Sequence, residues 1–276
     1  MSITEKMANM DRRVFYWILF FAMMVPFLSP IGFPLSIAPN TQDLYDGVTG
    51  DSIDAGEIWI INFGYGVSAW SECAPGVTVV TKALFREDAK IIFMGPHYDV
   101  ELTMNKLMED AGADFAGKEY GEDYVFLGYI TGGEAAITQL ASDMRSVYPQ
   151  DHHGTDLDDI PLMADVNEWR DIAGVLSSDT GDWGAYFLRQ WQEPHDVPLA
   201  QIGISMLGST GIPYWLAGNY FGMSVGSRGG AELEKLFGDL GEATTAMDSI
   251  SVSHLMIVIA VIMANIGVLT DRGRES

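Results

Sequence analysis

Two long uncharged apolar runs lie near the two ends of this 276-residue chain. The first covers residues 14–34 and the second covers residues 254–270. A helix rises about 1.5 Å per residue, so a run of ~20 residues crosses the ~30 Å hydrocarbon core of a bilayer. The second run reaches this length when the preceding serine–valine–serine stretch extends it. We therefore predict transmembrane helices at 14–34 and 251–270, with the lipid bilayer as a partner.

Basic residues flank both runs on the side of the chain termini. These residues are Lys6, Arg12, Arg13, Arg272 and Arg274. Because positively charged flanks tend to stay in the cytoplasm, residues 1–13 and 271–276 are predicted to be a cytoplasmic N-terminus and tail. The chain is then a two-pass protein of the cell membrane, and its main domain is extracytoplasmic.

A cleaved signal peptide is the alternative interpretation of the first run. The stretch "DRRVFYW" contains paired arginines, as twin-arginine signals do. Against cleavage, the apolar run is long and the following "LSIAPN" has no clean A-x-A site. A retained anchor is the favoured interpretation.

The composition excludes some classes of protein. The formal net charge is −23, whereas proteins that bind nucleic acid need a basic face. Nucleic acid is therefore not expected as a partner. A single cysteine excludes an intramolecular disulfide.

Short apolar runs alternate with helical patterns between the two predicted spans. The predicted strands are 57–63, 89–95, 123–130, 172–178 and 198–205. The predicted helices are 75–88, 99–115, 132–148, 183–193, 212–223 and 229–238. Uniformly apolar strands that alternate with helices are typical of a parallel sheet covered on both faces. We predict a Rossmann-like, doubly wound, mainly parallel α/β sheet of about five strands in a domain at 57–250, after a linker at 35–56.

Ligands of such sheets bind beyond the carboxyl ends of the strands. The predicted ligand-binding residues at these ends are Tyr65, Gly66, Tyr129, Gly132, Ser178 and Ser205. Tyr65 and Glu72 are expected to project over the sheet edge and to form a pocket wall. The small-molecule ligand itself is not identified by the pattern.

The first strand leads into Gly64-x-Gly66-x-x-Ala69, which fits the dinucleotide-binding fingerprint. A pyrophosphate site also needs a helix that begins at once. The helix is expected to begin at Pro75, which leaves too long a loop. No nucleotide or other cofactor is therefore predicted.

Carboxylates at several strand ends are the catalytic candidates, because paired acids can perform acid–base chemistry. The candidates are Asp99, Asp179 and Glu72. Asp99 and Asp182 are also predicted to cap the helices that follow them.

Two further motifs are weaker. His152 and His153 lie among carboxylates and are candidate metal ligands, but adjacent histidines usually point in different directions, so a solvated acidic loop is favoured. The stretch "GMSVG" at 222–226 fits G-x-S-x-G, which needs a strand before Ser224 and a helix after it. A helix-like aromatic run precedes it, so a chance match is favoured. The aromatic residues of that run, Tyr214, Trp215, Tyr220 and Phe221, are predicted to be core, with a membrane or subunit interface as the alternative.

Four stretches together resemble an uncharacterised family of bacterial and archaeal membrane proteins. They are "FGYG…SECAPG", "DYVFLGYITGG", "GTDLDDIPLM" and "GGAELE…ATTAMDSISVSHL". The resemblance implies an α/β domain between two terminal transmembrane helices and carries no known activity. Two functions remain open: a membrane-anchored binding or scaffold module, such as an accessory subunit that pairs with a membrane protein or a second copy, and an extracytoplasmic hydrolase or transferase.

Overall fold

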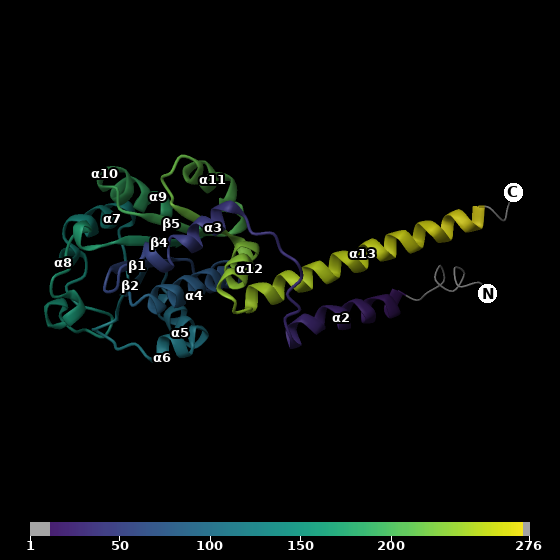
Figure 1. Ribbon diagram of the computed structural model, residues 1–276, viewed down its shortest axis with the longest axis horizontal. Coiled ribbons are helices and arrows are strands. Elements are labelled where there is room, and N and C mark those ends of the chain that lie inside the picture. Colours follow the sequence, from purple (N-terminus) through teal and green to yellow (C-terminus); the bar gives the residue numbers. More distant parts are fainter. Residues whose placement is uncertain (1–11, 273–276) are drawn as a thin grey trace. The chain divides into compact units, whose positions relative to one another are not determined.

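The computed structural model describes residues 12–272, and describes side chains for residues 13–266 (Figure 1). The chain divides into two compact units. The first unit is formed by Met1–Leu35 together with Leu240–Ser276, and the second is Ser36–Asp239. The first is helical and the second is an α/β unit.

The α/β unit contains a six-stranded sheet in the order β3-β2-β1-β4-β5-β6, in which every neighbouring pair is parallel. The strands are β1 (Ile58–Gly64), β2 (Lys90–Gly95), β3 (Tyr124–Tyr129), β4 (Gly174–Asp179), β5 (Leu199–Gly203) and β6 (Gly222–Val225). The predicted doubly wound α/β class is confirmed, and the predicted number of strands is one too low. The sixth strand, β6, has four residues and follows directly on the aromatic run, which made it look like the end of a helix.

Helices cover both faces of the sheet (Figure 1). They are α3 (Pro39–Asp46), α4 (Trp70–Arg86), α5 (Val100–Ala111), α6 (Ala113–Ala116), α7 (Gly133–Ser142), α8 (Met144–Val147), α9 (Trp183–Phe187), α10 (Glu193–His195), α11 (Gly208–Leu216) and α12 (Gly226–Phe237). Successive side chains of a strand point to opposite faces of the sheet, so alternate strand residues belong to two separate cores. Ile61 and Phe63 pack on the face of α4, α5 and α12, whereas Ile60 packs on the face of α7, α8 and α9.

All of the predicted linker at 35–56 except its first residue belongs to the α/β unit, and it contains α3. Leu44 of α3 is fully buried and packs so close to β6 that a Cβ at Gly222 would overlap its backbone. Asn40 Nδ2 donates to the carbonyl oxygen of Met223 at 2.7 Å. Helix α3 therefore covers the outer edge of β6, which protects the sheet from pairing with other chains.

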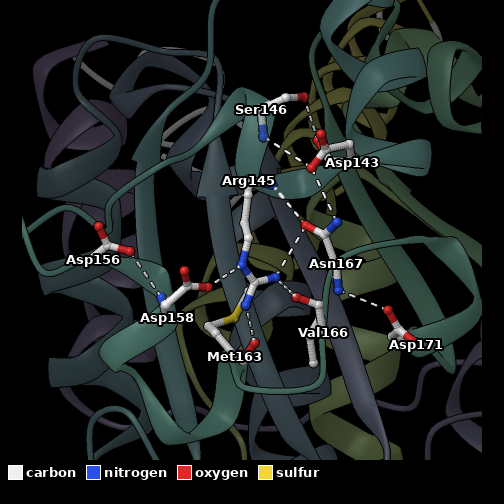
Figure 2. A network of polar contacts seen from close by, with 9 residues as sticks. All are labelled: Asp143, Arg145, Ser146, Asp156, Asp158, Met163, Val166, Asn167 and Asp171. Atoms are coloured by element: carbon white, nitrogen blue, oxygen red, sulfur yellow. Dashed lines mark hydrogen bonds and ion pairs between the residues drawn. The ribbon is translucent and has the colours of Figure 1, made fainter.

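The long loop at 149–171 is held in place by Arg145 (Figure 2). Its Nε donates to Asp158 Oδ1 at 2.7 Å, and its Nη atoms donate to the carbonyl oxygens of Met163 and Val166. Nη1 also donates to Asn167 Oδ1 at 3.2 Å. A single guanidinium thus satisfies acceptors along much of the loop.

The helical unit contains α2 (Arg12–Leu28) and α13 (Glu242–Arg272), which lie side by side (Figure 1). Within α13, the 25 residues Glu242–Ile266 are long and apolar enough to cross a membrane by length and composition. Helix α2 is apolar but shorter. It ends before the predicted end at residue 34, because Pro30 and Pro34 cannot continue an α-helix.

Candidate functional site

The carboxyl edge of the sheet contains a buried carboxyl group at its centre. Asp179 is the last residue of β4, which pairs with β1 at the point where the strand order reverses. Its Oδ1 accepts a hydrogen bond from Ser177 Oγ at 2.9 Å, and its Oδ2 accepts one from Gln201 Nε2 at 3.2 Å. The side chain is fully buried, and burial raises the pKa of Asp179 to about 7 although these hydrogen bonds oppose the shift.

Two glycines make room for this carboxyl group. A Cβ at Gly64 would lie 2.5 Å from Asp179 Oδ1, and a Cβ at Gly184 would overlap Oδ2. The first glycine of the predicted dinucleotide fingerprint is therefore needed for packing against Asp179.

The second glycine of the fingerprint makes room for another carboxylate, that of Asp99. A Cβ at Gly66 would lie 2.9 Å from both carboxylate oxygens of Asp99. Asp99 Oδ2 accepts from the backbone N–H of Val67 at 2.9 Å, just before α4 begins. Asp99 stands at the N-cap position of α5 but does not cap it, which corrects the predicted role.

The start of α4 also corrects an expectation. The helix begins at Trp70 and contains Pro75 in its interior, so the loop after β1 is short. The spacing between the end of β1 and the start of α4 is therefore closer to that of a phosphate-binding turn than we predicted. The chain's own carboxylates occupy this end of the helix, where the helix dipole favours negative charge. Glu72, in the first turn of α4, accepts from the N–H of Ser205 at 2.7 Å and from its hydroxyl.

The predicted ligand-binding residues do not all line one pocket. Tyr65 is buried between Phe63 and Trp70, so it does not project over the sheet edge as expected. Ser178 is buried as well. Tyr129 and Gly132 are exposed at the end of β3, two strands away from β1.

Exposed apolar side chains form a rim along the same edge, which the sequence reasoning missed. The exposed fractions are 45% for Val67, 91% for Tyr98, 52% for Tyr129 and 81% for Met206. They follow or end strands β1, β2, β3 and β5, whose carboxyl ends share one edge because the strands are parallel. The only available signal was a large apolar residue directly after a strand. We call these four residues the apolar rim.

A cavity of about 210 Å³ lies beside β3, and none of its lining residues belongs to the apolar rim. Its lining residues are Glu101, Met104, Asn105, Met108, Tyr120, Tyr124, Phe126, His152 and His153. The two histidines line the same cavity, with ring centroids 5.7 Å apart, contrary to the expected divergence. Within residues 13–266, no group of three or more histidine, cysteine or acidic side chains is placed to hold a metal ion.

The first four residues of the G-x-S-x-G stretch form strand β6, which leads directly into α12. The aromatic run before it is helical up to Leu216, as expected, because α11 covers Gly208–Leu216. Ser224 nevertheless lies buried inside β6, and the residue with a positive φ at the turn is Gly226, at +59°. A nucleophile elbow places its serine at the turn itself, so this geometry does not form one.

Two smaller expectations are also corrected. Asp182 stands at the N-cap position of α9, but its side chain makes no capping hydrogen bond. In the aromatic run, Tyr220 is buried as predicted for core, whereas Tyr214 is exposed.

No family model, curated protein or solved structure matches this chain. Its class therefore follows from its own fold and site. It is a Rossmann-like α/β domain in which the usual ligand edge is filled by internal carboxylates. Within the part of the chain that the structure describes, one helix is a candidate membrane span.

Proposed function

We propose that this chain is a membrane-anchored binding or scaffold module that docks a protein partner on the carboxyl edge of its sheet. The apolar rim is the observation that carries the proposal. Large apolar side chains that are exposed together on one edge of a soluble domain mark an interaction site. The stretches that carry the rim, 65–69, 96–99, 129–132 and 204–207, contain no lysine or arginine. The partner surface is accordingly apolar.

The polar groups below the rim support docking over catalysis. Asp99 and Glu72 already accept hydrogen bonds from backbone N–H groups of neighbouring loops. These bonds hold the loops after β1, β2 and β5 against one another. A preorganised surface loses less entropy when a partner binds.

We propose further that both terminal helices are retained in the membrane as a hairpin. Asp248 of α13 accepts from the N–H groups of Ile31, Gly32 and Phe33 at 2.6, 2.8 and 3.0 Å. Removal of the first segment as a signal peptide would leave this buried carboxylate without these donors. The basic flanks support cytoplasmic termini and an extracytoplasmic α/β domain. This arrangement agrees with the proposed kinship to the uncharacterised membrane-protein family.

An extracytoplasmic hydrolase or transferase is the second candidate, and one observation favours it. With a pKa of about 7, Asp179 can exchange a proton near neutral pH, which suits a general acid or base. Its complete burial argues for a structural role. If Asp179→Asn abolishes a cellular phenotype while the protein stays folded and bound to its partner, the enzyme proposal gains over the docking proposal.

Native mass spectrometry of the full-length protein, extracted in mild detergent from its own membrane, tests the docking proposal. We expect an additional polypeptide mass that is lost in the double variant Tyr98→Ser, Met206→Ser. The matched control is Leu216→Ser, because Leu216 is 71% exposed but lies at the end of α11, outside the rim. Loss of the partner in both variants, retention in both, or a protein that always stays alone would overturn the proposal.

A further inference from the structure

We infer that the cavity beside β3 binds a small organic ammonium cation. The cavity has a volume of about 210 Å³ and lies between α5, the edge strand β3 and the loop that carries His152 and His153. None of its lining residues belongs to the apolar rim, and neither Asp99 nor Glu72 is among them. The inference therefore stands independently of the proposed function.

Aromatic rings form most of the wall. Tyr120 and Tyr124 meet edge to face at 5.3 Å between ring centroids, and Tyr120 meets His153 in the same way at 4.9 Å. On the other side, Phe126 and His152 have centroids 4.8 Å apart. Aromatic rings that surround a small space attract a cation through their negatively charged faces, and quaternary ammonium groups are recognised in this way.

The charge of the lining favours a cation over an anion. Glu101 contributes a carboxylate whose Oε2 lies 3.7 Å from His152 Nε2, and its side chain is 65% exposed. None of the described residues that line the cavity is a lysine or an arginine. Met104 and Met108 complete the wall with polarisable thioether groups that adapt to an alkyl substituent.

The aromatic wall is fixed in place before any ligand binds. The hydroxyl of Tyr120 donates to Asp151 Oδ2 at 2.5 Å. The buried Asp151 also accepts from the N–H groups of His153 and Thr155, at 2.9 and 2.8 Å. His152 N–H donates to the carbonyl oxygen of Phe126 at 2.9 Å, which ties the loop to β3. Little side-chain freedom remains to be lost on binding, which favours affinity for a small ligand.

Titration calorimetry with two probes of the same shape tests this inference. The probes are choline and its uncharged isostere 3,3-dimethylbutan-1-ol, added to the full-length protein in an uncharged maltoside detergent. We expect choline to bind at millimolar concentration or below, and the isostere to bind about tenfold more weakly, as a cation–π contribution of about 1–2 kcal/mol implies. Absence of choline binding, or equal affinity for both probes, would overturn the inference.

Four variants locate the binding. Glu101→Gln should weaken choline about fivefold, whereas Glu109→Gln, on the same helix but outside the lining, should leave it unchanged. Tyr120→Leu should weaken it more strongly, because the ring is lost. Tyr120→Phe removes the hydroxyl and retains the ring, so it should keep most of the choline affinity. Equal effects of the two glutamine variants, or of the two Tyr120 variants, would contradict the assignment of the site.

Discussion

Large apolar side chains face inward in the α/β unit and outward in the helical unit. Phe93, in β2, is fully buried and stacks on Phe63 at 5.7 Å between ring centroids. Phe20, in α2, is 51% exposed, and most large apolar residues of α2 and α13 are exposed like it. A phenylalanine is stabilised by packing inside the α/β unit, whereas in the helical unit it requires an apolar environment outside the protein. The outward pattern is what a lipid-facing helix requires.

Two buried carboxyl groups, Asp179 in the α/β unit and Asp248 in the helical unit, are satisfied in different ways. Asp179 has the neutral side chains of Ser177 and Gln201 as donors, in surroundings that raise its pKa to about 7. Asp248 has three consecutive backbone N–H groups as donors. The surroundings of Asp179 accommodate a protonated acid. The three donors around Asp248 instead require an acceptor with two oxygens.

The largest expected effect contrasts the two phenylalanines. Phe93→Ala should lower the free energy of unfolding by about 3–5 kcal/mol, because it leaves a cavity in a close-packed core. Phe20→Ala should change the unfolding of the α/β unit by less than about 0.5 kcal/mol. Chemical denaturation of the full-length protein in detergent, followed by tryptophan fluorescence, measures both. Similar losses for both variants would mean that Phe20 is packed and not lipid-facing.

The second prediction concerns the pH dependence that Asp179 causes. Since the folded protein holds this proton up to a pKa of about 7 and the unfolded chain releases it near 3.8, the folded state is favoured more at low pH. The contribution should be lost as pH rises from about 4 to about 7, by up to roughly 4 kcal/mol in total, and should stay constant above that.

Asp179→Asn should flatten this dependence, because the amide carries no charge. When the Gln201 amide turns over, its Oε1, which has no hydrogen-bond partner among the described residues, can accept from the new Nδ2. Denaturation of the wild type and the variant at pH 5 and pH 8 checks the difference. The same slope in both proteins would show that Asp179 is not the group responsible.

The third prediction concerns Asp248. Asp248→Asn replaces one acceptor oxygen with a donor that faces backbone N–H groups, so it should destabilise the helical hairpin by about 2–3 kcal/mol. Titration with a denaturing detergent, followed by helix content, measures this loss. Asp54→Asn, a loop aspartate of the α/β unit that is exposed, is the control and should have no effect. An unchanged midpoint in the Asp248 variant would contradict the hairpin.

The smallest expected effect is local to the α/β unit. Arg145→Lys should destabilise the loop at 149–171 by about 1–2 kcal/mol, because an ammonium group cannot reproduce the planar set of donors (Figure 2). Hydrogen exchange of amides in that loop should become faster, while amides of β1 stay protected. Equal acceleration in both places would indicate global destabilisation.

The strand pattern was predictable for β1 to β5, because their apolar runs are long and bounded by turn residues. The predicted boundaries lie within about two residues of the observed ones. The sixth strand and the start of α4 were not predictable in this way. Gly222–Val225 has four residues, and its strand conformation comes from pairing with β5. In α4, Pro75 lies in the helix interior, but prolines are common in the first turn of a helix, so the helix was predicted to begin there.

The site was less predictable than the fold. Candidate residues at the strand ends were found because parallel strands bring their carboxyl ends to one edge. Their partners were not, since Glu72 meets Ser205 across 133 positions of sequence and Asp99 meets Val67 across 32. A loop residue's exposure, as in the apolar rim, also depends on what packs over it.

The sequence alone determined the apolar runs, the alternation of strands and helices, and the acidic charge, because these follow from local periodicity and composition. Only the tertiary structure decided that the fingerprint glycines face Asp179 and Asp99, and that two adjacent histidines line one cavity. Local pattern sets which elements form. Strand order and loop packing set which side chains meet, and these depend on contacts between residues far apart in the chain.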